Sequence, residues 1–315
     1  MTNVVLLALV PIFFVLLLGY TAGKFRIVDN THVAPLNTVL MTYALPASLF
    51  VATATTARQE MLGQWPVLVI LAGAMMVVYP LWYLFQRRIR RQSPRESAVQ
   101  ALTVALPNYA AVGLPVASLL LGSNHTVPVA VAITAGALLP SPLTLALLEL
   151  PANSGTSQER GAFMRFIRAM SRALRKPIVL APVAGTALSL LALPLPSLAD
   201  TSLHLIGQMT GGLALFVTGL ILSAQHFRLS WNTAMAVAVT NIAQPLVAFA
   251  IASALPVPAA TAHVGILLAA LPSGFFGVLF GANYGLNSEA ADSALIASTG
   301  FALVTLAVAI AWLYG

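Results

Sequence analysis

Long hydrophobic stretches, each of about 20 residues, recur along the whole chain and are separated by short polar connections. A helix needs about this length to cross the hydrocarbon core of a bilayer. The pattern predicts an all-α membrane protein with ten transmembrane helices, segments 1 to 10 in chain order. They cover residues 3–23, 34–55, 65–86, 99–121, 127–149, 177–195, 202–223, 232–254, 262–281 and 291–313.

The composition agrees with this interpretation, since 59% of the 315 residues are hydrophobic and only 7% are charged. Soluble domains carry about 25% charged residues. The chain has no cysteine, which excludes disulfide bonds. Segment 1 follows Met1-Thr2-Asn3 without a basic region, so we expect a membrane helix there and not a cleaved signal peptide.

The basic residues are distributed unevenly between the two sides of the predicted membrane. Of the 15 lysines and arginines, all except Arg58 follow segment 1, 3, 5 or 7. Cytoplasmic loops carry an excess of basic residues, so both termini are expected on the outer, periplasmic side of a bacterial inner membrane. The formal charge of +7 is thereby explained by topology, and no nucleic-acid partner is expected.

The longest connection, residues 150–176, contains six of these basic residues. Apolar residues recur in it at helical spacing, at Phe163, Phe166, Ile167, Met170 and Leu174. This pattern is typical of a basic amphipathic helix on the cytoplasmic leaflet. The alternative is a linker whose charges only set the topology, and we expect a mixture of the two.

The two halves of the chain resemble each other at an offset of 164 to 166 residues. The stretch "PIFFVLLLG" from Pro11 matches "PIVLAPVAG" from Pro177, and "ALPNYAAVGL" from Ala105 matches "ALPSGFFGVL" from Ala270. Five helices are an odd number, so the second copy enters the membrane from the opposite side. We therefore predict two inverted five-helix repeats, residues 1–149 and 177–315, which is the architecture of many secondary transporters.

Each repeat has a proline in the middle of a hydrophobic segment. Pro107-Asn108 interrupts segment 4, and Pro272-Ser273 interrupts segment 9 at the matching position. A lone proline often only kinks a membrane helix, but a matched pair is a pointer to a transporter's binding site. We predict that broken helices 4 and 9 cross, and that unpaired N–H groups after the prolines bind an anion. Tyr109 and Gly274 belong to the same predicted site.

Other polar side chains at mid-membrane depth are further candidates for substrate contact. Asn241 and Gln244 rank first, because they stand three residues apart before Pro245, and Ser141 and Tyr43 follow. For each of them, a hydrogen bond that only holds two helices together is an equal alternative.

The eight acidic residues all fall in connections or at segment ends, so no buried carboxylate pair is expected. The histidines form no metal-binding spacing, and no nucleophile, base and acid are grouped as in an enzyme. The chain is therefore not expected to be an enzyme or to carry a cofactor.

The two interrupted segments resemble the auxin efflux carrier family. The resemblance lies in Leu106-Pro107-Asn108 with Gly113-Leu114-Pro115, and in "AALPSGFFGVLFGANYGLN" from Ala269 to Asn287. The family includes plant auxin carriers and bacterial carriers of malonate or other carboxylates. The resemblance implies an elevator-type transporter, often dimeric, with scaffold helices 1, 2, 6 and 7 and transport helices 3–5 and 8–10. It also implies that Asn108 contacts the substrate. The short connection 150–176 matches the bacterial members.

The sequence therefore predicts a carrier of small organic anions such as malonate, with H+ or Na+ as the coupling ion and a homodimer as the assembly. One alternative is a sodium-coupled organic anion carrier of the bile-acid-symporter type. An alternative of another class is a transporter-like membrane sensor or receptor.

Overall fold

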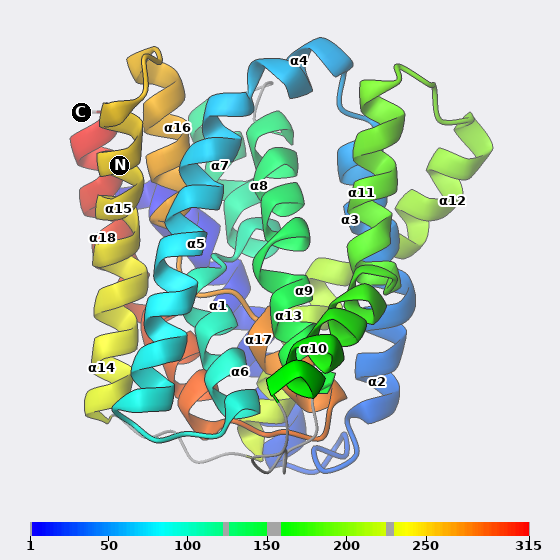
Figure 1. Cartoon of the computed structure of the whole chain (residues 1–315), viewed down its shortest axis with the longest axis vertical. Helices are drawn as coiled ribbons and strands as arrows, with labels where there is room; N and C mark the ends of the chain where they lie inside the picture. Colours follow the sequence, from blue (N-terminus) through cyan, green and yellow to red (C-terminus); the bar gives the residue numbers. More distant parts are fainter. Residues whose placement is uncertain (1, 122–125, 150–158, 225–229, 315) are drawn as a thin grey trace.

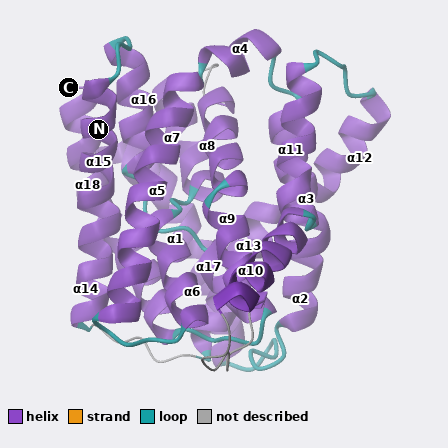
Figure 2. Cartoon of the chain, in the orientation of Figure 1, coloured by secondary structure: helices purple, strands orange, loops and turns teal. Residues whose placement is uncertain are grey.

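The computed structural model describes residues 2–121, 126–149, 159–224 and 230–314. Within these ranges the chain is built of helices, and no strand is present. Most helices run along the long axis of the molecule, and the two ends of the chain lie toward the same end of the array (Figure 1). Figure 2 shows that the connecting loops are short and that several lie inside the array, between helix ends.

One set of helices, the α1/α3 group, packs through two closely spaced pairs, α1 against α13 and α3 against α11. The group contains α1 (Thr2–Lys24), α2 (Ala34–Val39), the π-helical turn η1 (Leu40–Ala44), α3 (Leu45–Ala54), α11 (Pro177–Leu190), α12 (Ser197–Gly207) and α13 (Met209–Ser223).

Glycines permit both close pairs. A Cβ atom on Gly19 of α1 would lie 2.0 Å from the carbonyl oxygen of Phe216 on α13. A Cβ atom on Gly185 of α11 would lie 2.5 Å from the carbonyl oxygen of Phe50 on α3. Small residues let helix backbones approach closely in membranes, so these glycines set the spacing of the group.

The other set, the α5/α6 group, packs around α5 and α6. It contains α5 (Trp65–Arg88), α6 (Pro94–Ala105), η2 (Tyr109–Gly113), α7 (Leu114–Leu121), α8 (Thr126–Leu138), α9 (Pro140–Glu149), α14 (Trp231–Ala238), η4 (Val239–Ala243), α15 (Gln244–Ala254), α16 (Ala259–Ala269), α17 (Phe276–Asn283) and α18 (Glu289–Tyr314). The two groups meet where α8 packs on α3 and α11, and where α17 packs on α2.

Two further helices lie at opposite ends of the array (Figure 1). The short helix α4 (Arg58–Gly63) precedes α5, and α10 (Glu159–Leu174) packs against α9. The prediction of a helix in the connection 150–176 is confirmed for α10, while residues 150–158 lie outside the described residues. On α10, Met164, Ile167 and Leu174 are exposed beside arginines, as expected of an amphipathic helix.

By length and hydrophobicity, six helices of the described chain can cross a membrane. They are Ala34–Ala54, Trp65–Arg88, Val127–Glu149, Ser197–Ser223, Trp231–Ala254 and Glu289–Tyr314. Shorter apolar helices include Phe13–Lys24, Pro177–Leu190 and Ala259–Ala269. The prediction of an all-α membrane protein is confirmed at this level, and the segments with matched prolines are interrupted as expected.

Candidate functional site

Two interrupted helices meet in the middle of the α5/α6 group. The chain leaves α6 at Leu106 and re-enters helical structure at Tyr109, and it passes from α16 to α17 through residues 270–275. Pro107 and Ser273 pair as an antiparallel β-bridge where these two connections cross. The N–H of Asn108 donates to the carbonyl of Pro272 at 2.9 Å, and the N–H of Gly274 donates to the carbonyl of Leu106 at 2.8 Å.

The sequence explains why α6 ends here. A residue before proline is pushed out of the helical region, and Leu106 has φ −104° and ψ 103°. Because the chain leaves the helix here, the N–H groups of Asn108 and Tyr109 bond elsewhere, and the carbonyls of Val104 and Ala105 lose their helical partners. Two side chains from the segment α14–η4–α15 replace those partners. The Thr240 hydroxyl donates to the Val104 carbonyl at 3.0 Å, and the Gln244 amide donates to the Ala105 carbonyl at 2.9 Å.

The second connection is held by α18 and η4. The N–H of Ser273 donates to the Ser298 hydroxyl oxygen at 2.9 Å. Ser298 donates in turn to the side-chain oxygen of Asn241 at 2.6 Å, and Asn241 donates back to the Ser298 carbonyl at 3.0 Å. All three side chains are buried. Asn241 and Gln244 therefore make hydrogen bonds that hold neighbouring helices together, which was the alternative to substrate contact.

The expectation of unpaired N–H groups is wrong for four residues at the crossing. Asn108, Tyr109, Ser273 and Gly274 donate their N–H groups to protein acceptors. Within the described residues, no acceptor is present for the N–H groups of residues 276–278, the first turn of α17. On this side of the crossing, free donors are therefore found in the first turn of α17 and not at Ser273 or Gly274.

A small pocket lies beside the crossing, between the two helix groups. It is lined by Leu49, Leu106, Pro107, Tyr109, Ile133, Gly136, Ala137, Ser141, Ile178 and Phe276. Its free volume is about 20 Å³, which accommodates about one water molecule. The structure thus brings Pro107, Tyr109 and Ser141 to one pocket, together with the first residue of α17. The Ser141 hydroxyl has no protein hydrogen-bond partner among the described residues.

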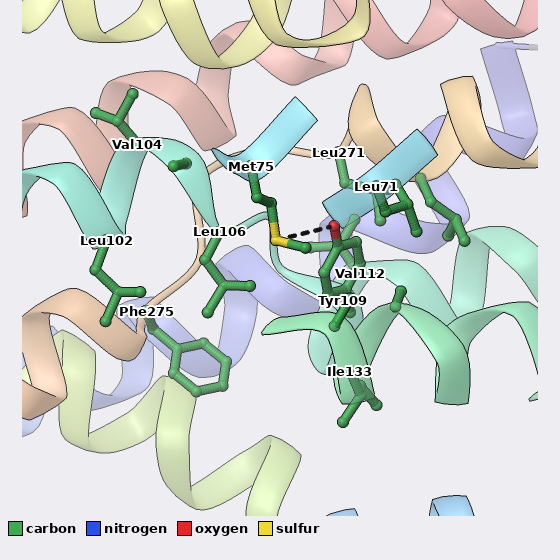
Figure 3. Close-up of a cluster of buried hydrophobic side chains, with 14 of the residues drawn as sticks. Leu71, Met75, Leu102, Val104, Leu106, Tyr109, Val112, Ile133, Leu271 and Phe275 are labelled. Carbon is green, nitrogen blue, oxygen red and sulfur yellow. Dashed lines mark hydrogen bonds between the residues drawn. The ribbon is translucent and has the colours of Figure 1, made fainter. Parts of the chain in front are cut away.

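The Tyr109 hydroxyl lies 3.9 Å from the sulfur of Met75 on α5, a helix that does not line this pocket. Figure 3 shows this contact within a cluster of buried apolar side chains that includes Val112 and Leu271. Tyr109 is only 3% exposed, so its ring contributes an apolar surface to the site.

Tyr43 is not brought to the crossing. Its side chain is 58% exposed and lines a separate groove between α3, α11 and α12, together with Phe50 and Leu203. Sequence position alone placed it at mid-depth, but the direction of its side chain depends on the packing of the α1/α3 group.

A larger cavity leads toward the end of the array where α4 lies. It has a volume of about 320 Å³ and lies between α3, α4, α8 and α12. Its polar lining consists of Ser48, Thr55, Thr56, Glu60, His204 and Gln208. Ile133 lines both this cavity and the small pocket, so the two spaces are separated at that side chain.

Sequence reasoning missed three residues of this region. Thr240 and Ser298 bind the backbone at the crossing, and no local signal distinguishes them from other hydroxyl residues of membrane helices. Asp292 lies at the start of α18, as its place at a segment end suggested, but it is only 3% exposed. The start of α18 therefore buries one carboxylate, whereas the sequence had excluded only a buried carboxylate pair. Among the described residues, no group of three His, Asp or Glu side chains is placed to hold a metal ion.

Comparison with known proteins places this architecture in a family. Residues 4–310 match the family described as "Membrane transport protein". The chain is 26% identical to "Uncharacterized transporter YfdV" of Escherichia coli (strain K12) over 310 residues, 97% of this chain and 96% of that protein. It is also 26% identical to "Putative malonate transporter" of Rhizobium meliloti (strain 1021) over 300 residues, 94% of this chain and 92% of that protein. The chain therefore belongs to the membrane transport protein family, the auxin efflux carrier family, and is a multi-pass membrane transporter.

Proposed function

We propose that this transporter carries a small organic carboxylate, with malonate as the first candidate, by alternating access at the crossing of the two interrupted helices. The observation that carries the proposal is the antiparallel pairing of Pro107 with Ser273 beside a pocket between two helix groups. Such paired interruptions mark the binding sites of secondary transporters. The name of the Rhizobium relative supports malonate as the substrate to test first.

The anion would bind between the first turn of α17 and the Ser141 hydroxyl. A helix N-terminus attracts negative charge through its free N–H groups and its dipole. Phe276 begins α17 and lines the same pocket as Ser141. Pro107, Asn108, Pro272, Ser273 and Gly274 would shape the site through the backbone pairing, and Asn241 and Gln244 would support it from behind.

The pocket would have to widen for a carboxylate to enter, because it holds about one water molecule. It lies between the two helix groups, so movement of one group past the other would open it. In this proposal the α1/α3 group is the scaffold and the α5/α6 group is the moving transport domain of an elevator. The larger cavity ending at Ile133 would be the route from the α4 end.

An inverted repeat would supply the two alternating conformations, with residues 1–149 and 177–315 as the copies and 150–176 as the connection. Two close contacts support it. Gly19 meets Phe216 and Gly185 meets Phe50, and both members of the second pair stand at the repeat offset from the first. The two contacts would then be equivalent, each joining a glycine of one repeat to the matching phenylalanine of the other. We also propose that the chain crosses the membrane ten times, with both termini on the periplasmic side, and that it forms a homodimer.

Uptake of labelled malonate into proteoliposomes tests the function. The expected result is saturable uptake that Ser141→Ala weakens. Asn108→Ala should abolish it, because the family resemblance implies that the Asn108 side chain contacts the substrate, while its backbone pairing would be kept in the variant. Tyr43→Phe is the matched control and should transport like the unaltered chain, since Tyr43 lies in another groove. Absence of flux for malonate and related carboxylates would overturn the proposed substrate class. Unchanged flux in both site variants would overturn the proposed site.

A further inference from the structure

A series of hydrogen bonds between buried polar side chains crosses three helices at the end of the array where α6 and α18 begin. The Gln86 amide on α5 donates to the Asn232 side chain on α14 at 2.6 Å. Asn232 donates to the Gln100 side chain on α6 at 3.1 Å, and Gln100 donates to the Glu96 carboxylate at 2.8 Å. Gln86, Gln100 and Asn232 are at most 6% exposed. Glu96 is therefore the acceptor on which this series ends.

A fourth helix adds a second donor to Glu96. The hydroxyl of Ser288, the residue before α18, accepts the N–H of Ala291 at 3.1 Å and donates to the same Glu96 oxygen that Gln100 contacts. Ser288 thus caps α18 and connects its first turn to α6. The Glu96 carboxylate is matched by donors from two helices.

Asp292 lies in the first turn of α18 and has no such match. Its side chain is 3% exposed, and its Oδ2 atom has no hydrogen-bond partner. The charges that act on it are Glu96 and Glu289, which are both acidic. An unpaired buried charge is costly. A proton on Oδ2 would remove that charge and turn an unmatched acceptor into a donor.

The described surroundings of Asp292 offer no cation in place of a proton. α14, η4 and α17, which pack on α18, have no charged residue. The histidine of α16, His263, lies against Tyr314 at the other end of α18. Arg95 on α6 donates to the Tyr284 carbonyl, and Lys24 at the end of α1 is exposed. Glu289 is a third carboxylate nearby, but no group of three His, Asp or Glu side chains is placed to hold a metal ion among the described residues. Glu96 accepts two hydrogen bonds and Asp292 Oδ2 accepts none, so a single bound proton would reside on Asp292.

Both helices of this cluster also reach the crossing. α6 carries Glu96 at its start and ends at Ala105, whose carbonyl binds Gln244, about 14 Å further along the helix. α18 carries Asp292 and, about 9 Å along, Ser298, which holds the N–H of Ser273. A change in how α6 and α18 pack at the cluster would therefore have a direct route to both connections of the crossing.

We propose that Glu96 and Asp292 form a proton-binding site in which Asp292 carries the proton, and that its occupancy is coupled to substrate binding at the crossing. The exposed neighbour Glu289 and the half-buried Glu96 connect the site to solvent. The coupling part rests on the proposed function. The proton site itself is a property of the chain without any substrate.

Infrared spectroscopy of the full-length protein, titrated over pH, tests the proton site without a substrate. A protonated-carboxyl band is expected that disappears as the pH rises, is absent in Asp292→Asn, and is retained in Glu289→Gln. Glu96→Gln removes the neighbouring negative charge, so the band should disappear at a lower pH in that variant. A band unchanged by Asp292→Asn, or none assignable to Asp292, would overturn the proposal. A band that responds to sodium and not to pH would overturn the identity of the ion.

Malonate affinity, measured by calorimetry at mildly acidic and mildly alkaline pH, tests the coupling. The unaltered chain is expected to bind roughly 5-fold or more weakly at the alkaline pH, a typical coupling between two sites. Asn is isosteric with a protonated Asp, so Asp292→Asn should keep the low-pH affinity at both pH values. Because both proteins are measured in the same buffers, the protonation of malonate itself affects both affinities equally. Identical pH profiles would overturn the coupling. If no carboxylate binds, the proposed function fails, while the infrared result still decides the proton site.

Discussion

The backbone N–H of Asn108 donates to the carbonyl of Pro272 at 2.9 Å, and this bond joins two residues from opposite halves of the chain. Both belong to stretches that interrupt a helix at a proline. Backbone groups left without helical partners at one interruption therefore bond to those at the other. Side chains of α14–η4–α15 and α18 bond three further backbone groups, those of Val104, Ala105 and Ser273, so these side chains are informative targets for mutation.

Gln244→Ala should destabilise the protein. Gln244 is 0% exposed and its amide donates to the Ala105 carbonyl, so its loss leaves a buried carbonyl without a donor. We expect a loss of about 1–3 kcal/mol in the free energy of unfolding. Chemical denaturation in detergent measures it, with Gln59→Ala on the exposed surface of α4 as the control. Equal stability of the two variants would show that the Ala105 carbonyl finds another partner.

Ser298→Ala should lower both stability and transport. The Ser298 hydroxyl accepts the Ser273 N–H and donates to Asn241, so its removal leaves both groups unmatched at the crossing. The expected cost is about 1–3 kcal/mol, with a lower rate of malonate uptake if the crossing is the site. Ser253→Ala is the matched control, because Ser253 is exposed on α15. Normal uptake by a destabilised Ser298→Ala protein would argue that Ser298 is structural only.

Gly19→Ala and Gly185→Ala should each destabilise the α1/α3 group. The added Cβ atom would meet a carbonyl oxygen at 2.0 Å and 2.5 Å respectively, and backbone must move to admit it. Overpacking of this kind costs about 1–3 kcal/mol. Gly300→Ala on α18 has no atom within 4 Å of the new Cβ and should stabilise by about 0.5–1 kcal/mol. Thermal unfolding of the three variants distinguishes the opposite signs.

On the alkaline side, the contacts of Lys176 with Glu149 and Tyr284 should keep their strength until high pH. Burial lowers the pKa of Lys176, but its contacts with Tyr284 and Glu149 outweigh burial and raise that pKa above its ordinary value. The stabilisation is therefore fully present below about pH 10.4, the ordinary pKa of lysine, and is lost as the pH rises through the raised value. The difference in thermal midpoint between the unaltered chain and Lys176→Met should stay constant near neutrality and shrink at alkaline pH. A difference that shrinks near neutrality would contradict this assignment.

Much of the architecture was predictable from local features. Hydrophobic stretches and their polar ends identify the helices, because burial in lipid depends on the residues of one segment. Pro107 and Pro272 identify the interruptions, because proline removes a donor wherever it stands. The pairing of Asn241 and Gln244 with neighbouring backbone was foreseen as one of two alternatives, but their spacing in the chain could not decide between them.

The sequence by itself determined the class of the protein, the hydrophobic segments that form helices and the two matched prolines at which helices are interrupted. Only the tertiary structure decided which backbone donors at the crossing remain free, that Tyr43 faces another groove, and that Asp292 is buried beside Glu96. The physical reason is the range of the interactions. Helix formation and proline breaks depend on neighbours within a few residues, whereas the partner of a polar group depends on which distant helices pack against it.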